Sequence, residues 1–378
     1  MAIEHIIDFL EPINPHLILQ DVGLNKAQIG KNIIFFEETF PDIEKADIIL
    51  IGCNEYRGFA HIDQTLHNAN IIRNELYKLY YWHNEIKIID IGNIKVGSGL
   101  QDSYSAIKMV LSELLMFKKK IIILGGSHDI TIPQYQAYQS QKKLIDATVI
   151  DSKIDFDVEG NIPAFHYLEH LFTSIPNHLR HYNHIGFQSY CTHPDILLTI
   201  DKLKFDCYRL GKVKESIIEM EPIFRSSHLI SIDISSIQHA HAPSNTEYPN
   251  GFNGEEICTL MQYAGMSNLA STTGVFGYLA KHDTHFLTAK QMAQMIWYFI
   301  DGANKLKSEK PITDKTQYIE YKTAFTNLDT IFLQNKFTGR WWMQLEDKSF
   351  IACSFQDYLV ANKNEFPERW IREMERRN

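Results

Sequence analysis

Ile121-Ile-Ile-Leu-Gly-Gly-Ser-His-Asp129 joins an apolar run, two glycines and a histidine within nine residues. Its four leading apolar residues are typical of a short buried strand, and the two glycines end that strand. Paired glycines let the backbone turn sharply, which would bring His128 to the rim of a sheet. Because ligand sites in α/β sheets lie beyond the carboxyl ends of the strands, His128 is a candidate functional residue.

Similar apolar runs recur along the chain and alternate with segments of helical periodicity. We expect strands at 46–52, 86–91, 121–124, 147–151, 184–187 and 228–234. We expect helices at 68–81, 103–117, 130–138, 255–263 and 289–302. Strands that alternate with helices indicate βαβ units, so the sequence predicts an α/β fold with a mostly parallel sheet covered on both faces.

The two ends of the chain do not follow this alternation. Residues 305–316 are polar and contain Pro311, which is typical of a linker. Beyond them, 332–345 and 349–352 have the pattern of antiparallel strands, and 365–378 is charged and predicted to be helical. We therefore expect an N-terminal arm (1–45), an α/β domain (46–304) and a small C-terminal β-containing extension packed on it (317–378).

The composition of the 378 residues is that of a globular protein, with 44% hydrophobic and 22% charged residues. A formal net charge of −9 argues against general binding to nucleic-acid backbones, which needs a basic surface. Five widely spaced cysteines indicate reduced thiols rather than a disulfide framework. The N-terminus lacks the pattern of a signal peptide, and no apolar run approaches the ~20 residues that span a membrane. We expect a soluble cytoplasmic protein.

Polar residues also follow two other predicted strands. The segments are Asp151-Ser-Lys-Ile-Asp155 and Ser231-Ile-Asp-Ile-Ser235. If each stays extended, alternate side chains project to one side, because strand side chains have a period of two. Together with His128, these segments would bring one imidazole and several carboxylates to one sheet edge. Such a donor set suits a divalent ion such as Mn²⁺.

The ordered set of strand ends resembles the ureohydrolase family, which includes arginase, agmatinase and formimidoylglutamase. Its signatures are Gly-Gly-x-His, Asp-Ala-His-x-Asp and Ser-x-Asp-x-Asp, and the match covers roughly residues 46–302. Asn70-Ile-Ile-Arg73 and Asp90-Ile-Gly92 are similar to further family segments. The resemblance implies a three-layer α/β/α fold, in which a dinuclear manganese centre hydrolyses guanidino or imino C–N bonds.

The resemblance implies a first metal site formed by His128, Asp151, Asp155 and Asp233. It places Lys153 and Ser235 where the family has the histidine and the aspartate of its second metal site. It also places Gly277 where the family has a Glu that holds the cationic group of the substrate. Because a protonated ammonium cannot ligate a metal and a neutral hydroxyl is a poor substitute for a carboxylate, the resemblance implies one Mn²⁺ ion or none.

The role of Lys153 leaves two arrangements open. Its ammonium could lie beside a single metal ion, where it would take the electrostatic place of the second ion. Alternatively, Lys153 could form salt bridges with the aspartates and leave the site without metal.

Two functions are therefore open. The first is a formimidoylglutamase-like hydrolase that uses one metal ion and water to cleave an amidine or guanidino C–N bond, with Asp155, His166 or His241 handling protons. The second is a non-catalytic relative that keeps the fold for binding or regulation. In the first case the ligand is a small amidine or guanidino compound. We expect a homo-oligomer with no nucleic-acid or membrane partner.

Overall fold

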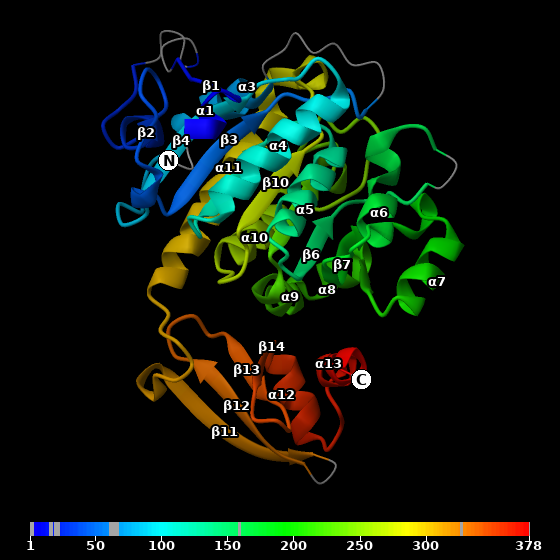
Figure 1. Cartoon of the computed structure of the whole chain (residues 1–378). Coiled ribbons are helices and arrows are strands. Elements are labelled where there is room, and N and C mark those ends of the chain that lie inside the picture. Colours follow the sequence, from blue (N-terminus) through cyan, green and yellow to red (C-terminus); the bar gives the residue numbers. More distant parts are fainter. Residues whose placement is uncertain are drawn as a thin grey trace.

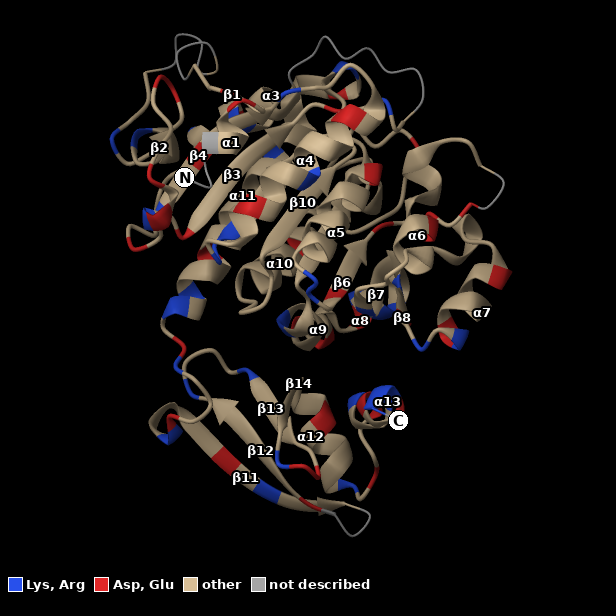
Figure 2. Ribbon diagram, in the orientation of Figure 1, with Lys and Arg blue, Asp and Glu red and all other residues tan. Residues whose placement is uncertain are grey.

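The computed structural model describes residues 4–14, 18, 23–59, 68–157, 160–325 and 328–377. These residues form a three-layer α/β/α body and a smaller antiparallel module below it in Figure 1. Figure 2 shows charged residues of both signs on the helices and loops, whereas the strands of the central sheet are mostly uncharged. No helix of the described part of the chain is both long and apolar enough to cross a membrane.

The central sheet contains ten strands within the described residues, in the order β1-β4-β3-β5-β10-β9-β6-β7-β8, with β2 also paired to β4. Only β1 among them pairs in the antiparallel sense. The bounds are β1 Leu10–Glu11, β2 Ile34–Phe35, β3 Ile48–Cys53, β4 Ile88–Ile94, β5 Lys120–Leu124, β6 Ile145–Ile150, β7 Leu179–Phe187, β8 Asp206–Arg209, β9 Leu229–Asp233 and β10 Thr272–Phe276. The α/β fold predicted from the sequence is confirmed.

Side-chain alternation explains why the strands are apolar on both faces. In β3, Ile48 and Leu50 pack on one side of the sheet, whereas Ile49 and Ile51 pack on the other. A parallel sheet with helices on both faces requires such continuous apolar runs. The same rule applies to β5, where all of 121–124 is buried. The sheet therefore holds the strand ends that carry the polar residues in fixed relative positions.

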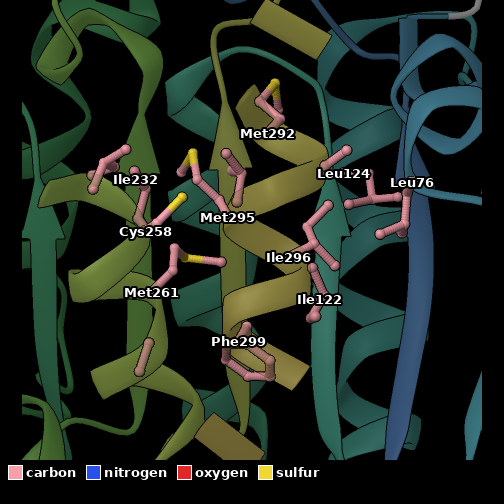
Figure 3. Packing of buried hydrophobic residues seen from close by; sticks show 14 of the residues in the cluster. Leu76, Ile122, Leu124, Ile232, Cys258, Met261, Met292, Met295, Ile296 and Phe299 are labelled. Carbon is pink, nitrogen blue, oxygen red and sulfur yellow. The ribbon is translucent and has the colours of Figure 1, made fainter. Parts of the chain in front are cut away.

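Helices cover both faces of the sheet. One face carries α3 Asn68–Tyr77, α8 Leu210–Glu215, α9 Glu221–Ser226, α10 Gly254–Gly265 and α11 Leu287–Lys307. The other carries α1 Glu4–Ile7, α4 Leu100–Leu115, α5 Thr131–Ser140, α6 Pro163–Thr173 and α7 Pro194–Lys202. Figure 3 shows the first layer, in which Met295, Ile296 and Phe299 of α11 lie against the strands that carry Ile122 and Ile232.

The N-terminal segment contributes two short strands to the sheet. β1 pairs with Asn93 and Ile94, and β2 pairs with Ile89 and Asp90, so both lie against β4. Of the expected arm, residues 1–3, 15–17 and 19–22 lie outside the described residues. The division into an arm, a central domain and an extension stays a prediction.

The C-terminal module is a four-stranded antiparallel sheet within the described residues, in the order β11-β12-β13-β14, with two helices. The bounds are β11 Tyr318–Phe325, β12 Leu328–Asn335, β13 Trp341–Gln344, β14 Phe350–Cys353, α12 Phe355–Asn362 and α13 Glu368–Arg377. The single strand predicted at 332–345 is wrong, because a turn around Gly339 (φ +71°) separates β12 from β13. The predicted C-terminal helix is present as α13, and Asn378 lies outside the described residues.

Two buried arginines join this module to the central body. Arg225 of α9 donates hydrogen bonds to the backbone oxygens of Trp341 and Cys353, both 2.8 Å long. Its guanidinium lies 4.5 Å from the centre of the Trp342 ring. These contacts connect α9 to β13 and β14.

Arg340, just before β13, is the second of these arginines, and its side chain is 3% exposed. It lies 3.0 Å from Glu309 and 3.4 Å from Glu221, both of which are also buried side chains. It donates a 2.6 Å hydrogen bond to the backbone oxygen of Met266. The module is therefore attached through charges that have little access to water.

Candidate metal centre

Four adjacent strands end at the candidate site. His128 follows β5, Asp151 follows β6, Asp233 ends β9 and Gly277 follows β10. The backbone reaches His128 through Gly125, whose φ is +80° and where a Cβ would lie 2.9 Å from the backbone oxygen of Cys53. Both features favour glycine at this turn.

His128 faces three carboxylates, those of Asp151, Asp155 and Asp233, which we call the aspartate cluster. Its Nδ1 atom lies 3.0 Å from Asp151 Oδ2, 3.3 Å from Asp155 Oδ2 and 3.8 Å from Asp233 Oδ2. The imidazole and the side chains of Asp151 and Asp155 are at most 5% exposed. His128 Nδ1 nevertheless has no hydrogen-bond partner among the described residues. A buried nitrogen without a partner is therefore aimed at the aspartate cluster.

A chain of hydroxyl groups determines which nitrogen of His128 carries a proton. The Thr131 hydroxyl donates to the backbone oxygen of His128 at 2.7 Å, because a carbonyl can only accept. Its contact with Ser231 Oγ, also 2.7 Å, must then use the hydrogen of Ser231. Ser231 Oγ is left to accept from His128 Nε2 at 3.0 Å. Nε2 therefore carries a proton, and in the neutral imidazole the Nδ1 lone pair is directed at the aspartate cluster.

The aspartates that could bridge two ions use their two oxygens differently. Oδ2 of Asp151 and Oδ2 of Asp233 face His128 Nδ1. Oδ1 of Asp151 accepts a hydrogen bond from the Ser235 hydroxyl, and Oδ1 of Asp233 accepts from the Ser235 backbone N–H at 2.7 Å. Ser235 thus occupies the oxygens that point away from His128.

Lys153 lies on the open side of the aspartate cluster. Its Nζ is 4.0 Å from Asp155 Oδ1, and it lies 4.3 Å from the centre of the Phe165 ring. The side chain is 26% exposed, so the ammonium keeps contact with solvent. A cation over an aromatic face near a carboxylate is stabilised in its charged form.

The pKa values of Asp155 and Asp233 are raised, partly because the aspartates lie close to one another. Burial raises the pKa of Asp155 well above its usual range, and the neighbouring Asp151 raises it further. Burial and Asp151 likewise raise the pKa of Asp233 to about 6. Burial opposes ionisation of Asp151 too, but His128 and Ser235 lower its pKa to about 2. Burial lowers the pKa of His128, yet Asp151 and Asp155 raise it well above its usual value. The group therefore favours an added cation.

A cavity of about 60 Å³ opens above the aspartate cluster. It is lined by His128 and the aspartate cluster, which we call its floor, and by the side chains of Phe59, Phe165 and Leu279, which we call its apolar wall. The rings of Phe59 and Phe165 pack edge to face, with their centres 5.3 Å apart. Among the described residues, Glu247 and Lys153 are the other charged side chains that line the cavity.

The two histidines predicted to handle protons, His166 and His241, do not line this cavity. In α6 the backbone at His166 departs from helical geometry, and its ring lies 6.0 Å from that of His170, while the preceding Phe165 lines the cavity. His241 belongs to the loop after β9, and its ring packs against the first residue of α10. A Cβ on Gly254 would lie 3.2 Å from His241 Nδ1. The geometry does not support a catalytic role for these two residues, whereas Asp155 lies in the cluster.

Gly277 lines the cavity but leaves no room for a larger residue. Its φ is +84°, and a Cβ there would lie 2.7 Å from Asp233 Oδ2. The backbone of β10 therefore approaches Asp233 directly. No side chain reaches the cavity from this position.

Several site residues were not identified from the sequence. Ser231 lies within a recognised segment, but its contact with His128 depends on the pairing of β9 beside β6 and on Thr131 of α5. Tyr167 of α6 lies 3.3 Å from His128 Nε2, and Glu247 reaches the cavity from the loop after β9. Tyr167 and Glu247 carry no motif signal.

The donor set fits a divalent cation. Carboxylate and imidazole together match Mn²⁺ and similar ions, and ligand atoms of His128, Asp151 and Asp155 all lie within 4.8 Å of one another. The partnerless Nδ1 atom supplies a lone pair where the carboxylates supply negative charge. Ser235 donates hydrogen bonds to the outer oxygens of Asp151 and Asp233.

Comparisons with known proteins agree with this geometry. The family model described as the arginase family matches residues 49–300. A 78-residue segment is 37% identical to an agmatinase of Blochmanniella floridana, a match that covers 20% of this chain and about a quarter (26%) of that protein's length.

Solved structures show the same fold. The formiminoglutamase of Trypanosoma cruzi, solved with Mn²⁺, has a TM-score of 0.64 at 14% identity, and the match covers 73% of this chain and 98% of that one. The formimidoylglutamase of Bacillus subtilis has a TM-score of 0.66 at 16% identity, covering 75% and 95%. The agmatine ureohydrolase of Thermoplasma volcanium has a TM-score of 0.59 at 16% identity, covering 77% and 98%. The chain belongs to the arginase family.

Proposed function

We propose that this arginase-family protein is a hydrolase that uses one divalent metal ion and water to cleave a C–N bond of a small amidine or guanidino compound. The observation that carries the proposal is the different use of the aspartate oxygens. One oxygen each of Asp151 and Asp233 faces His128 Nδ1, whereas the other accepts a hydrogen bond from Ser235. Such an arrangement supports one ion rather than two.

The residues that would hold the ion are His128 and the aspartate cluster. A divalent ion bound there supplies a Lewis acid that brings the pKa of a water molecule towards neutrality. Ser231 and Thr131 keep the proton of His128 on Nε2. Lys153 adds a positive charge beside Asp155, on the side away from His128. The apolar wall formed by Phe59, Phe165 and Leu279 restricts water around the ligand.

Metal analysis combined with an activity assay tests this proposal. We expect about one bound Mn²⁺ per chain after loading and hydrolysis of formimidoylglutamate, agmatine or arginine. The metal-free protein should be inactive. A loaded protein that hydrolyses none of the three compounds would contradict the catalytic proposal.

A non-catalytic role is the second candidate, and one observation favours it. With Lys153 beside Asp155 and a second proton on His128, at Nδ1, the aspartate cluster gains two positive charges without any metal. The fold would then serve binding or regulation. This candidate predicts far less than one metal ion per chain and no turnover.

Restoring the ligand types of the second site should change the number of bound ions. In the double variant Lys153→His, Ser235→Asp, an imidazole and a carboxylate replace the ammonium and the hydroxyl that now face Asp155 and Asp151. We expect the Mn²⁺ content to rise from about one to about two per chain by elemental analysis, because both new groups are metal ligands. The single variant Ser235→Ala, which removes the hydroxyl without adding a ligand, is the control. An unchanged metal content in the double variant would place these residues outside a metal centre.

A further inference from the structure

Glu247 has a charged side chain that lines the cavity, and it is not one of the residues that would hold the metal ion. It lies on the loop after β9 and lines the cavity at its solvent-exposed rim. Among the described residues, no side chain forms a hydrogen bond or an ion pair with its carboxylate, although Lys153 lines the same cavity. Partial burial and repulsion from Asp233 and Asp151 raise its pKa to about 7, while Lys153 acts in the opposite direction. The carboxylate therefore lies in the field of the aspartate cluster without a cation of its own.

The position of Glu247 is determined by Asn245, which is 3% exposed. The Asn245 Oδ1 atom accepts hydrogen bonds from the backbone N–H groups of Glu247 and Tyr248, each 3.1 Å long. Its Nδ2 atom donates to the backbone oxygens of Ser235 at 3.2 Å and Ile237 at 2.8 Å. The loop that carries Glu247 is thus tied to the same segment that contacts the aspartate cluster. The backbone at Glu247 is therefore held beside the cavity.

The charges of the cavity leave Glu247 uncompensated. One divalent ion and the Lys153 ammonium together balance the three negative charges of the aspartate cluster. When Glu247 is ionised, the described lining residues carry a further negative charge that no positive group among them neutralises. A ligand that bears one positive charge would complete the balance.

We propose that Glu247 binds the cationic group of the ligand, an amidinium or guanidinium, through its carboxylate. A planar cation with several N–H donors suits a carboxylate, with which it forms two parallel hydrogen bonds. Phe59 and Leu279 give the same cavity an apolar wall for the rest of a small ligand. This inference rests on the proposed function for the nature of the ligand. It makes Glu247 a specificity-determining residue rather than a catalytic one.

Two other positions do not perform this task. Gly277 has no side chain and no space for one beside Asp233. Lys153 carries the same sign of charge as the ligand and lies between Asp155 and the Phe165 ring. A ligand cation is therefore attracted by Glu247 and repelled by Lys153.

Binding of acetamidinium and of its uncharged isostere acetamide tests the proposal. The affinities are measured by saturation-transfer NMR of the methyl signal, with the full-length protein. We expect the wild-type protein to bind acetamidinium about tenfold more tightly than acetamide, equivalent to about 1.4 kcal/mol. Glu247→Gln should remove this preference and leave acetamide binding unchanged, and Glu247→Asp should retain part of it. Glu255→Gln, which removes the same charge from the exposed start of α10, is the matched control and should behave as wild type.

The results separate this inference from the proposed function. A preference for acetamidinium that persists in Glu247→Gln, or that is absent from the wild-type protein, would overturn the role of Glu247. The same holds if the wild-type protein binds neither probe. Metal content and turnover are measured on the same samples, so a preference lost in Glu247→Gln without metal or turnover would support the binding role and contradict the hydrolase.

Discussion

Replacing His128 with alanine should lower the affinity for Mn²⁺ by more than about 100-fold. The substitution removes the only nitrogen ligand of the described cluster and leaves three carboxylates that repel one another. Changes to groups that merely orient a ligand cost 10–100-fold, so the loss of a ligand should exceed that range. Competition with a fluorescent chelator at neutral pH measures the affinity directly.

Ser231→Ala provides the graded comparison. Without the Ser231 hydroxyl, nothing in the hydroxyl chain keeps the proton of His128 on Nε2, although Tyr167 remains 3.3 Å from that atom. We therefore expect a loss of about 10–100-fold in Mn²⁺ affinity, smaller than for His128→Ala. Equal affinities for the wild-type protein and His128→Ala would show that the metal, if bound, is bound elsewhere.

Replacing Arg340 with alanine should lower the free energy of unfolding by about 3–5 kcal/mol. The variant leaves Glu309 buried without its arginine and removes the hydrogen bond to the Met266 backbone. Glu221 keeps Arg225, 2.9 Å away, as its one remaining arginine. An unpaired buried charge is costly because the protein interior does not solvate it as water does. Urea unfolding followed by circular dichroism measures the change.

The control for this prediction is an exposed ion pair of the same module. Arg377→Ala breaks the 2.6 Å contact with Asp347, where both side chains are more than a third exposed. Exposed pairs contribute at most about 1 kcal/mol, so this variant should unfold nearly as the wild type does. A loss below about 1 kcal/mol for Arg340→Ala would mean that the junction between the module and the body is hydrated.

The strand ends that carry the site were predictable, but four strands of the sheet were not: β1, β2, β8 and β10. β1 and β2 have only two residues each. β10 reads Thr-Thr-Gly-Val-Phe and has too few large apolar residues to stand out, yet it lies between β5 and β9 and is fully buried. β8 has four residues at the sheet edge, where half-buried side chains give a weak pattern. Tertiary context, rather than local propensity, makes β8 and β10 strands.

The candidate site shows the same limit. His128, Asp151 and Asp233 follow or end strands, so sheet topology alone brings them together. Glu247 is placed by the hydrogen bonds of Asn245, which no periodicity reveals. Helix α6 was not predicted from the sequence. At its start the side chain of Phe165 lines the cavity, whereas the side chain of the next residue, His166, does not. Motifs on regular elements can therefore be assigned from sequence, whereas side chains supplied by loops depend on contacts formed only on folding.

The close approach of Gly277 to Asp233 makes the positions around this site unequally tolerant of substitution. Lys153 and Ser235 line an open cavity, so other side chains can be accommodated there. A side chain at position 277 would have to adopt a φ of +84°, and its Cβ would lie 2.7 Å from Asp233 Oδ2. Any residue larger than glycine at 277 would therefore displace the Asp233 carboxylate from the aspartate cluster. Variation at 153 and 235 can alter the charge of the cavity, whereas variation at 277 would alter the cluster itself.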